Sequence, residues 1–172
     1  MTTQPDHKPA IHFSRLSLSQ QIIYALGTGF GTGLAPKAPG TVSSAAVLLL
    51  VPLWVWLGFY SSLGLIVLMS IVGIWICGRT AQMMQVHDDS RIVWDEFAGQ
   101  SIALLPLLLL DQVSWLGVLL AFVVFRLFDV WKPWPIRLAD YHIHGGFGIM
   151  LDDILAGLMA AVVIYAGFIV AL

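Results

Sequence analysis

Residues 86–97 read Val86-His87-Asp88-Asp89-Ser90-Arg91-Ile92-Val93-Trp94-Asp95-Glu96-Phe97. This polar stretch lies between two apolar segments, and it holds four of the ten acidic residues of the chain. Residues 126–137 and 144–153 have the same character, because each mixes charged side chains with tryptophan, proline or glycine beside an apolar run. Charged groups next to long apolar segments are costly to keep unless they serve a purpose, so these three stretches are the candidates for a functional site.

The composition predicts an integral membrane protein with one domain. The 172 residues are 59% hydrophobic and 10% charged, and the mean hydropathy is +0.88, whereas soluble domains carry about 25% charged residues. The net charge of −2 and the absence of a basic run speak against a nucleic-acid partner. With one cysteine, Cys77, the chain can form neither an internal disulfide nor a cysteine-rich zinc site.

The apolar segments predict an all-α fold, a polytopic membrane bundle of about four to five membrane helices. We expect membrane helices at residues 42–60, 63–78, 92–110, 113–130 and 150–172, with turns at 61–62 and 111–112. Residues 1–15 are predicted to be a flexible tail, and residues 16–172 a single domain. Within it, residues 16–26 should form a short interfacial helix capped by Ser17, lying on the membrane rather than crossing it.

The charge distribution predicts the orientation of the chain. With these turns, residues 1–41, 79–97 and 126–153 lie on one side of the membrane and contain all eight Lys and Arg, all five His and nine of the ten acidic residues. Lys and Arg concentrate on the cytoplasmic side, so the charged side should face the cytoplasm. The N-terminal residues also lack the pattern of a signal peptide.

Five carboxylates are expected at one depth, just under this cytoplasmic surface. Two lie at the start of the predicted helix 92–110, one at the end of helix 113–130 and two at the start of helix 150–172. In chain order they are Asp95, Glu96, Asp129, Asp152 and Asp153. Such a cluster would repel itself unless a cation neutralised it. Oxygen ligands favour Mg²⁺, Mn²⁺ or Ca²⁺ over zinc, and Mg²⁺ commonly uses one or two carboxylates together with substrate phosphate.

Basic side chains near these carboxylates suggest a phosphate ligand. Arg126, Lys132 and Arg137 fall within one short stretch, and Lys37 and Arg91 lie on the same side of the membrane. The glycine-rich residues 27–41, which include Gly31 and Thr41, could bring backbone N–H groups to a phosphate, or could serve only as a hinge. His87, His142 and His144 could protonate a leaving alkoxide.

Simpler interpretations exist for each group. The acidic pairs could only favour helix dipoles, and Arg126 with Asp129 could be a plain i,i+3 ion pair. A small ion-binding or transport membrane protein is the alternative function, although it would place charges in mid-membrane rather than at one face.

Several of these motifs together resemble the bacterial phosphatidylglycerophosphatase A family. They are residues 92–97 (Ile-Val-Trp-Asp-Glu-Phe), Phe125-Arg126 with Asp129, residues 131–137, residues 144–150 with Asp152-Asp153, and Gly29-Phe30-Gly31 with Pro39-Gly40-Thr41. The resemblance covers roughly residues 20–170.

The resemblance implies a Mg²⁺-dependent enzyme of the bacterial inner membrane, with its active site facing the cytoplasm and phosphatidylglycerophosphate, a membrane lipid, as substrate. Asp95, Glu96, Asp129, Asp152 and Asp153 would hold the metal, and Arg126, Lys132, Arg137, Lys37, Gly31 and Thr41 would contact phosphate. Asp95, Asp129 and His144 are the expected catalytic residues. Attack by water and attack by a carboxylate both remain open.

Overall fold

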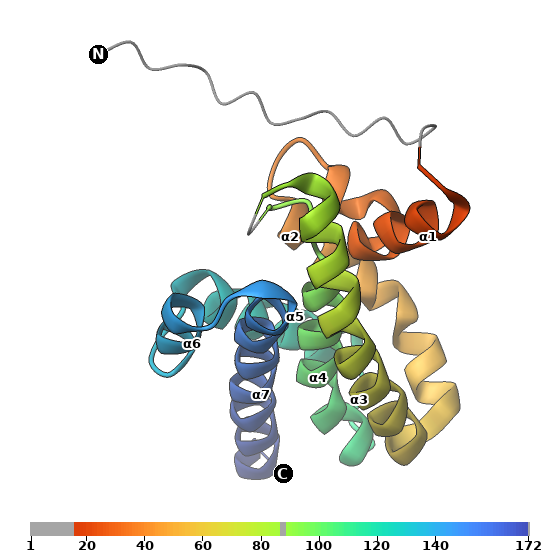
Figure 1. Cartoon of the computed structure of the whole chain (residues 1–172). Coiled ribbons are helices and arrows are strands. Elements are labelled where there is room, and N and C mark those ends of the chain that lie inside the picture. Colours follow the sequence, from red (N-terminus) through yellow and green to blue (C-terminus); the bar gives the residue numbers. More distant parts are fainter. Residues whose placement is uncertain (1–15, 87–88, 172) are drawn as a thin grey trace.

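The computed structural model describes residues 16–86 and 89–171, and within these residues every regular element is a helix (Figure 1). The elements are α1 (Leu18–Gly27), the 3-10 helix η2 (Gly29–Leu34), α2 (Pro39–Val47), the 3-10 helix η3 (Leu48–Leu50), α3 (Val51–Met84), α4 (Trp94–Leu109), α5 (Trp115–Trp131), α6 (Ile136–His142) and α7 (Gly145–Ala171). The all-α prediction is confirmed. The short first helix is confirmed as well, because the Ser17 side chain accepts a hydrogen bond from the Gln20 N–H, as an N-cap should.

The first hairpin turns at a glycine rather than at the predicted Ser61-Ser62. Gly58 has φ 72° and ψ 173°, and the ribbon reverses direction there within α3 (Figure 1). Glycine adopts a positive φ without steric cost. Ser62 instead sits inside the second limb, and its hydroxyl donates to the Trp54 carbonyl of the first limb (3.1 Å). A serine pair therefore does not mark a turn when its hydroxyls find backbone acceptors.

Helix α4 lies at the centre of the bundle and packs against α7, α3 and α5. Its side chains enter three apolar clusters, through Leu104 and Leu107 on one side, Ala98 on a second and Ala103 on a third. Because α4 is enclosed, the side chains of its first turn are fixed relative to those of its neighbours. The predicted turn near 111–112 is confirmed, since α4 ends at Leu109 and α5 begins at Trp115.

Helix α7 begins at Gly145, five residues before the predicted start at residue 150, and so includes Gly146 and Gly148. The contact between α7 and α4 depends on glycine at both sides. A Cβ at Gly157 would collide with the Gly99 carbonyl oxygen, and a Cβ at Gly99 would lie 2.6 Å from the Asp153 carbonyl oxygen. Small residues allow helix backbones to approach this closely in membrane bundles. The approach places the N-terminal part of α4 next to the stretch of α7 that contains Asp153.

Two helical stretches are long and apolar enough to cross a membrane, Pro39–Met84, which contains the reversal at Gly58, and Gly145–Val170. Helices α4 and α5 have 16 and 17 residues, slightly fewer than the roughly 20 of a typical membrane helix.

Replacing Gly157 with alanine should loosen the contact between α4 and α7. We expect Gly157→Ala to lower the free energy of unfolding by about 1–3 kcal/mol, because the new methyl group overlaps the Gly99 backbone. Gly167→Ala is the matched control on the same helix, since nothing lies within 4 Å of a Cβ there. Thermal unfolding of both variants in detergent measures the difference. Equal stabilities would contradict the proposed packing.

Candidate functional site

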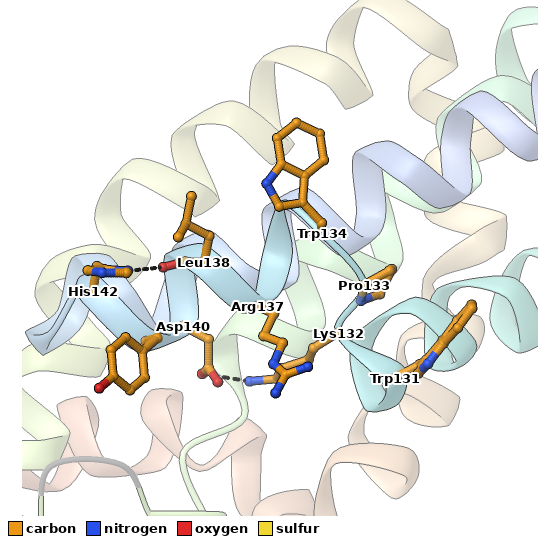
Figure 2. A pocket seen from close by; sticks show the side chains of 9 residues that line it. Trp131, Lys132, Pro133, Trp134, Arg137, Leu138, Asp140 and His142 are labelled. Carbon is orange, nitrogen blue, oxygen red and sulfur yellow. Dashed lines mark hydrogen bonds and ion pairs between the residues drawn. The ribbon is translucent and has the colours of Figure 1, made fainter.

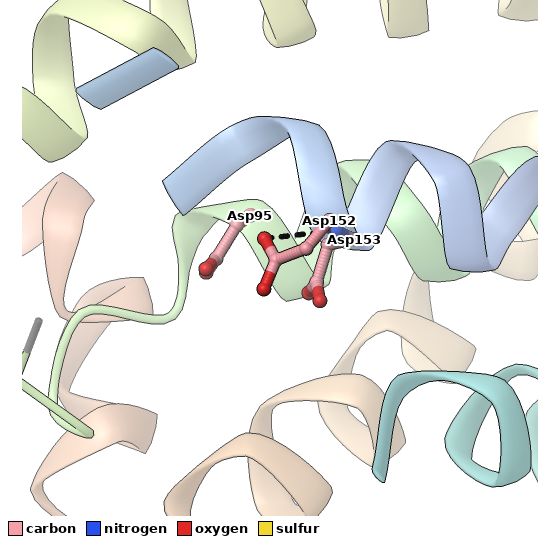
Figure 3. Close-up of side chains that lie close together, drawn as sticks. All are labelled: Asp95, Asp152 and Asp153. Atoms are coloured by element: carbon pink, nitrogen blue, oxygen red, sulfur yellow. Dashed lines mark hydrogen bonds between the residues drawn. The ribbon is translucent and has the colours of Figure 1, made fainter. Parts of the chain in front are cut away.

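Three aspartates from α4 and α7 form a compact carboxylate group at the charged end of the bundle. Asp95 lies in the first turn of α4 and Asp152 and Asp153 lie in α7, and one carboxylate oxygen of each falls within 4.8 Å of the others (Figure 3). Asp152 and Asp153 are buried. We call Asp95, Asp152 and Asp153 the carboxylate triad. The Gly99–Gly157 approach described above brings its two helices together.

Hydrogen bonds satisfy only part of the triad. The N–H of Glu96 donates to Asp95 Oδ1 (3.0 Å), and the N–H of Asp153 donates to Asp152 Oδ1 (3.1 Å). In contrast, Asp153 Oδ2 is buried and has no hydrogen-bond partner among the described residues. A buried carboxylate oxygen without a donor is expensive, so this atom calls for a ligand that supplies positive charge.

Glu96 and Asp129 form a second group, held together by Arg126. Arg126 Nη1 lies 2.5 Å from Glu96 Oε2 and 2.5 Å from Asp129 Oδ2. The Ser44 hydroxyl, on α2, donates to the same Glu96 oxygen at 2.6 Å. A Cβ at Gly40 would collide with Glu96 Oε1, so a larger residue here would displace the Glu96 side chain from this network. The side chains of Arg126, Glu96 and Asp129 are all at least 84% buried, which makes the pairing important for stability.

Lys132 connects the triad to a surface groove. Its Nζ lies 2.6 Å from Asp152 Oδ2 and 2.8 Å from Asp140 Oδ1. Burial alone would lower the pKa of Lys132, but the two carboxylates outweigh it and hold this pKa above its ordinary value. Lys132 is therefore a fixed positive charge. It also lines a groove of about 660 Å³ between the end of α5 and α6 (Figure 2).

The triad fits a divalent cation with a preference for oxygen ligands. Its donors are carboxylate oxygens alone, their spacing allows one ion to contact all three residues, and one buried oxygen lacks a donor. Lys132 pairs with Asp152 and no ion pair joins a cation to Asp95 or Asp153 within the described ranges. Mg²⁺ or Mn²⁺ suits such a site better than zinc.

The predicted site residues therefore fall into separate places. The five carboxylates share one end of the bundle but divide into the triad and the Arg126 network. The simple i,i+3 ion pair between Arg126 and Asp129 does form. A role for Glu96 and Asp129 as metal ligands stays a prediction, since the oxygens they use for Arg126 lie outside the triad.

The remaining predicted phosphate and acid–base residues lie around this centre. Lys37 and Gly31 are exposed, and neither they nor Thr41 bond to the site carboxylates in the described structure. The Gly31 N–H donates to the Thr28 carbonyl (3.0 Å), so it is already occupied. Arg91 is held bidentately by Asp89, with both contacts at 2.8 Å. Arg137 and His142 line the groove, His144 is an exposed residue just before α7, and His87 lies outside the described residues.

Sequence reasoning missed three polar residues of this region. Ser44 and Asp140 bond directly to Glu96 and Lys132, and Gln100, one helical turn after Glu96, is fully buried with neither amide atom bonded among the described residues. Ser44 and Gln100 were detectable as polar residues inside apolar segments. Apart from its charge, nothing in the sequence around Asp140 indicated a place in the site.

Comparison with known proteins agrees with this picture. A family model described as phosphatidylglycerophosphatase A matches residues 25–168. Phosphatidylglycerophosphatase A of Escherichia coli (strain K12) is 44% identical over 168 residues, which cover 96% of this chain and 93% of that protein. The Haemophilus influenzae protein of the same name is 43% identical over 145 residues, covering 84% and 87%.

A third relative carries another name. A Bacteroides thetaiotaomicron protein, provisionally named a phosphatidylinositol-3-phosphatase, is 37% identical over 147 residues, covering 81% of this chain and 89% of that protein. No solved structure gives a significant match. The family model spans most of the chain and the first two relatives are similar over nearly their whole length. The chain therefore belongs to the phosphatidylglycerophosphatase A family.

Proposed function

We propose that this protein hydrolyses phosphatidylglycerophosphate to phosphatidylglycerol and inorganic phosphate, in a Mg²⁺-dependent reaction. Membership of the family assigns the chain to the phosphoric monoester hydrolases. The single observation that carries the metal dependence is the carboxylate triad, in which three acidic side chains meet beside one fixed lysine. Metal-assisted phosphoryl transfer requires this combination of anionic metal ligands and cationic phosphate contacts.

Asp95, Asp152 and Asp153 would hold the metal, with Glu96 and Asp129 as the further predicted ligands. When bound, Mg²⁺ would offset the repulsion among the carboxylates and polarise the oxygens of the phosphate monoester. Asp153 supplies the buried oxygen that lacks a protein donor. The first turn of α4 and the packed interior of α7 keep the ligand atoms in place before the substrate arrives, which lowers the cost of reorganisation during the reaction.

Lys132 and Arg126 are the basic groups nearest the carboxylates. Lys132 would bind the terminal phosphate as a point charge, because it already contacts Asp152 of the triad. In direct hydrolysis a water oxygen forms the new bond to phosphorus as the bond from phosphorus to the glycerol oxygen breaks. In the alternative, a carboxylate oxygen displaces the glycerol oxygen first, and water then cleaves the acyl phosphate to release inorganic phosphate. The departing glycerol oxygen takes up a proton, for which His144 is the predicted donor.

The same arrangement supports a membrane protein whose site faces the cytoplasm. The two limbs of the first hairpin, α4, α5 and α7 would cross the bacterial inner membrane, with α4 shielded by its neighbours. Trp131 and Trp134 at the charged end, and Tyr60 and Trp115 at the other, are exposed as interfacial aromatic residues are. The lipid tails would stay in the bilayer while the head group reaches the triad.

The substrate is chosen from the family and from the chemistry of the site. Two relatives are named as phosphatidylglycerophosphatases and one for a phosphoinositide. Both named substrates are membrane lipids that carry a phosphate monoester. Phosphatidylglycerophosphate is therefore the first substrate to test, with phosphatidylinositol 3-phosphate as the comparison.

Phosphate release from phosphatidylglycerophosphate should require both Mg²⁺ and the triad. We expect chelation to abolish the activity of the purified protein and added Mg²⁺ to restore it. Asp95→Asn should lower kcat by about 100-fold or more, as when one group that stabilises transition-state charge is lost. Asp111→Asn is the control, because Asp111 is an aspartate in the turn between α4 and α5, away from the charged end.

Two results would contradict the proposal. Full activity in the presence of a chelator would show that the reaction does not need the metal. Full activity of folded Asp95→Asn would show that it does not need the triad. A higher kcat/KM for phosphatidylinositol 3-phosphate than for phosphatidylglycerophosphate would keep the reaction class and change the substrate.

Arg126→Gln should destabilise the protein strongly, because it leaves Glu96 and Asp129 buried without their cation. We expect a loss of about 3 kcal/mol in the free energy of unfolding. The double variant Glu96→Gln/Arg126→Gln should regain part of that stability, since one uncompensated charge is removed. Thermal unfolding in detergent reports the stability, and phosphate release reports activity. Because Glu96 is itself a predicted metal ligand, the double variant is compared with Glu96→Gln alone. If Arg126 also contacts phosphate, the double variant is less active than Glu96→Gln; equal activities limit Arg126 to a structural role.

A further inference from the structure

The groove between the end of α5 and α6 is lined by none of the three triad aspartates, but it shares Lys132 with them. Its lining includes Lys132 at the end of α5 and Arg137 with Asp140 on α6, and the Lys132 ammonium group contacts Asp140 (Figure 2). Arg137 and Asp140 are three residues apart on a helix, so they face the same side. Lys132 is shared, because its ammonium group contacts Asp140 in the groove and Asp152 in the triad. A ligand in the groove would therefore have one end next to the triad.

Arg137 is a positive charge in this groove that has no ion-pair partner among the described residues. Lys132 is balanced by two carboxylates, whereas Arg137 is exposed and forms no ion pair with residues 16–86 or 89–171. A guanidinium group binds a phosphate oxygen pair in a bidentate manner. The groove thus offers a second anion contact, separate from the metal ligands.

Aromatic side chains border the groove where the membrane surface would lie. Trp131 is 71% exposed, Trp134 78% and Tyr141 77%, and all three line the groove. Large exposed aromatic residues with a polar edge are suited to the boundary between lipid tails and head groups. The groove combines this largely apolar border with Arg137, which forms no ion pair within the described residues, and this combination fits an anionic lipid head group at the membrane surface.

We infer that the groove binds the phosphodiester of the substrate lipid through Arg137, while the terminal phosphate monoester of the same head group reaches Lys132 and the triad. This inference rests on the proposed function. It explains selectivity, because phosphatidylglycerophosphate carries both phosphates on one glycerol unit, whereas phosphatidic acid carries only the monoester. Arg137 would then determine specificity, because it binds the phosphodiester and not the phosphate monoester that is hydrolysed.

The test uses phosphatidylglycerol, which keeps the diester phosphate and lacks the terminal one. Short-chain phosphatidylglycerol in detergent micelles should inhibit phosphatidylglycerophosphate hydrolysis competitively. Arg137→Gln should raise the Ki for phosphatidylglycerol and the KM for phosphatidylglycerophosphate by about tenfold or more, the effect of losing a charge-assisted contact, with little change in kcat. Arg137→Lys should recover part of the loss. Any hydrolysis of phosphatidic acid should be the same in the wild type and in Arg137→Gln.

Arg79→Gln is the matched control, because Arg79 is an exposed arginine near the end of α3 whose side chain hydrogen-bonds only to Gln82 within the described ranges. Binding of phosphatidylglycerol is also followed by the fluorescence of the groove tryptophans, which needs no turnover. An unchanged Ki and an unchanged binding constant in folded Arg137→Gln would overturn the inference, as would a fall in kcat alone. Wild-type protein that binds phosphatidylglycerol through Arg137 but releases no phosphate would instead contradict the proposed function.

Discussion

Acidic side chains inside an apolar bundle impose the constraint on which this structure depends. A buried carboxylate is stable only when positive charge or hydrogen-bond donors compensate it. The chain compensates Glu96 and Asp129 with Arg126 and Ser44, and Asp152 with Lys132. Within the described residues, Asp95 and Asp153 form no ion pair, Asp95 accepts one backbone N–H, and Asp153 Oδ2 has no donor, all beside Asp152. The ion pairs of Arg126 and Lys132 thus hold the neighbouring side chains in place, and the triad oxygens stay open to a ligand.

Close packing of the helices sets the positions of these carboxylates. The contact between Gly99 and Gly157 sets the separation of α4 and α7, and Gly40 gives Glu96 room against α2. Because α4 is enclosed by the other helices, its first turn cannot move without disturbing the core. The triad is therefore preorganised, as a site that stabilises a developing charge should be. The groove beside Lys132 adds a place for the rest of a lipid head group.

Much of the architecture was readable from hydrophobic segments, but orientation around each helix was not. The apolar runs predicted the helices, Ser17 predicted the first cap, and the depth of the carboxylates predicted their common end. Segment length does not report the direction in which a side chain points, so the division between the triad and the Arg126 network was missed. The first turn was predicted at Ser61-Ser62 rather than at Gly58, and the last helix was predicted to start five residues too late, because a glycine can interrupt a helix or lie inside one, and only its neighbours decide. The role of Asp140 could not be predicted, because its contact with Lys132 depends on how α6 packs beside the end of α5.

The most direct test is to locate a metal in the folded protein. Crystals of the full chain grown with Mn²⁺ would be measured by anomalous scattering, alongside crystals of Asp153→Asn. A metal held by the triad predicts an anomalous peak within bonding distance of Asp95, Asp152 and Asp153, weakened or lost in the variant. Wild-type crystals that contain Mn²⁺ and show no peak between these three carboxylates would contradict the metal-dependent site.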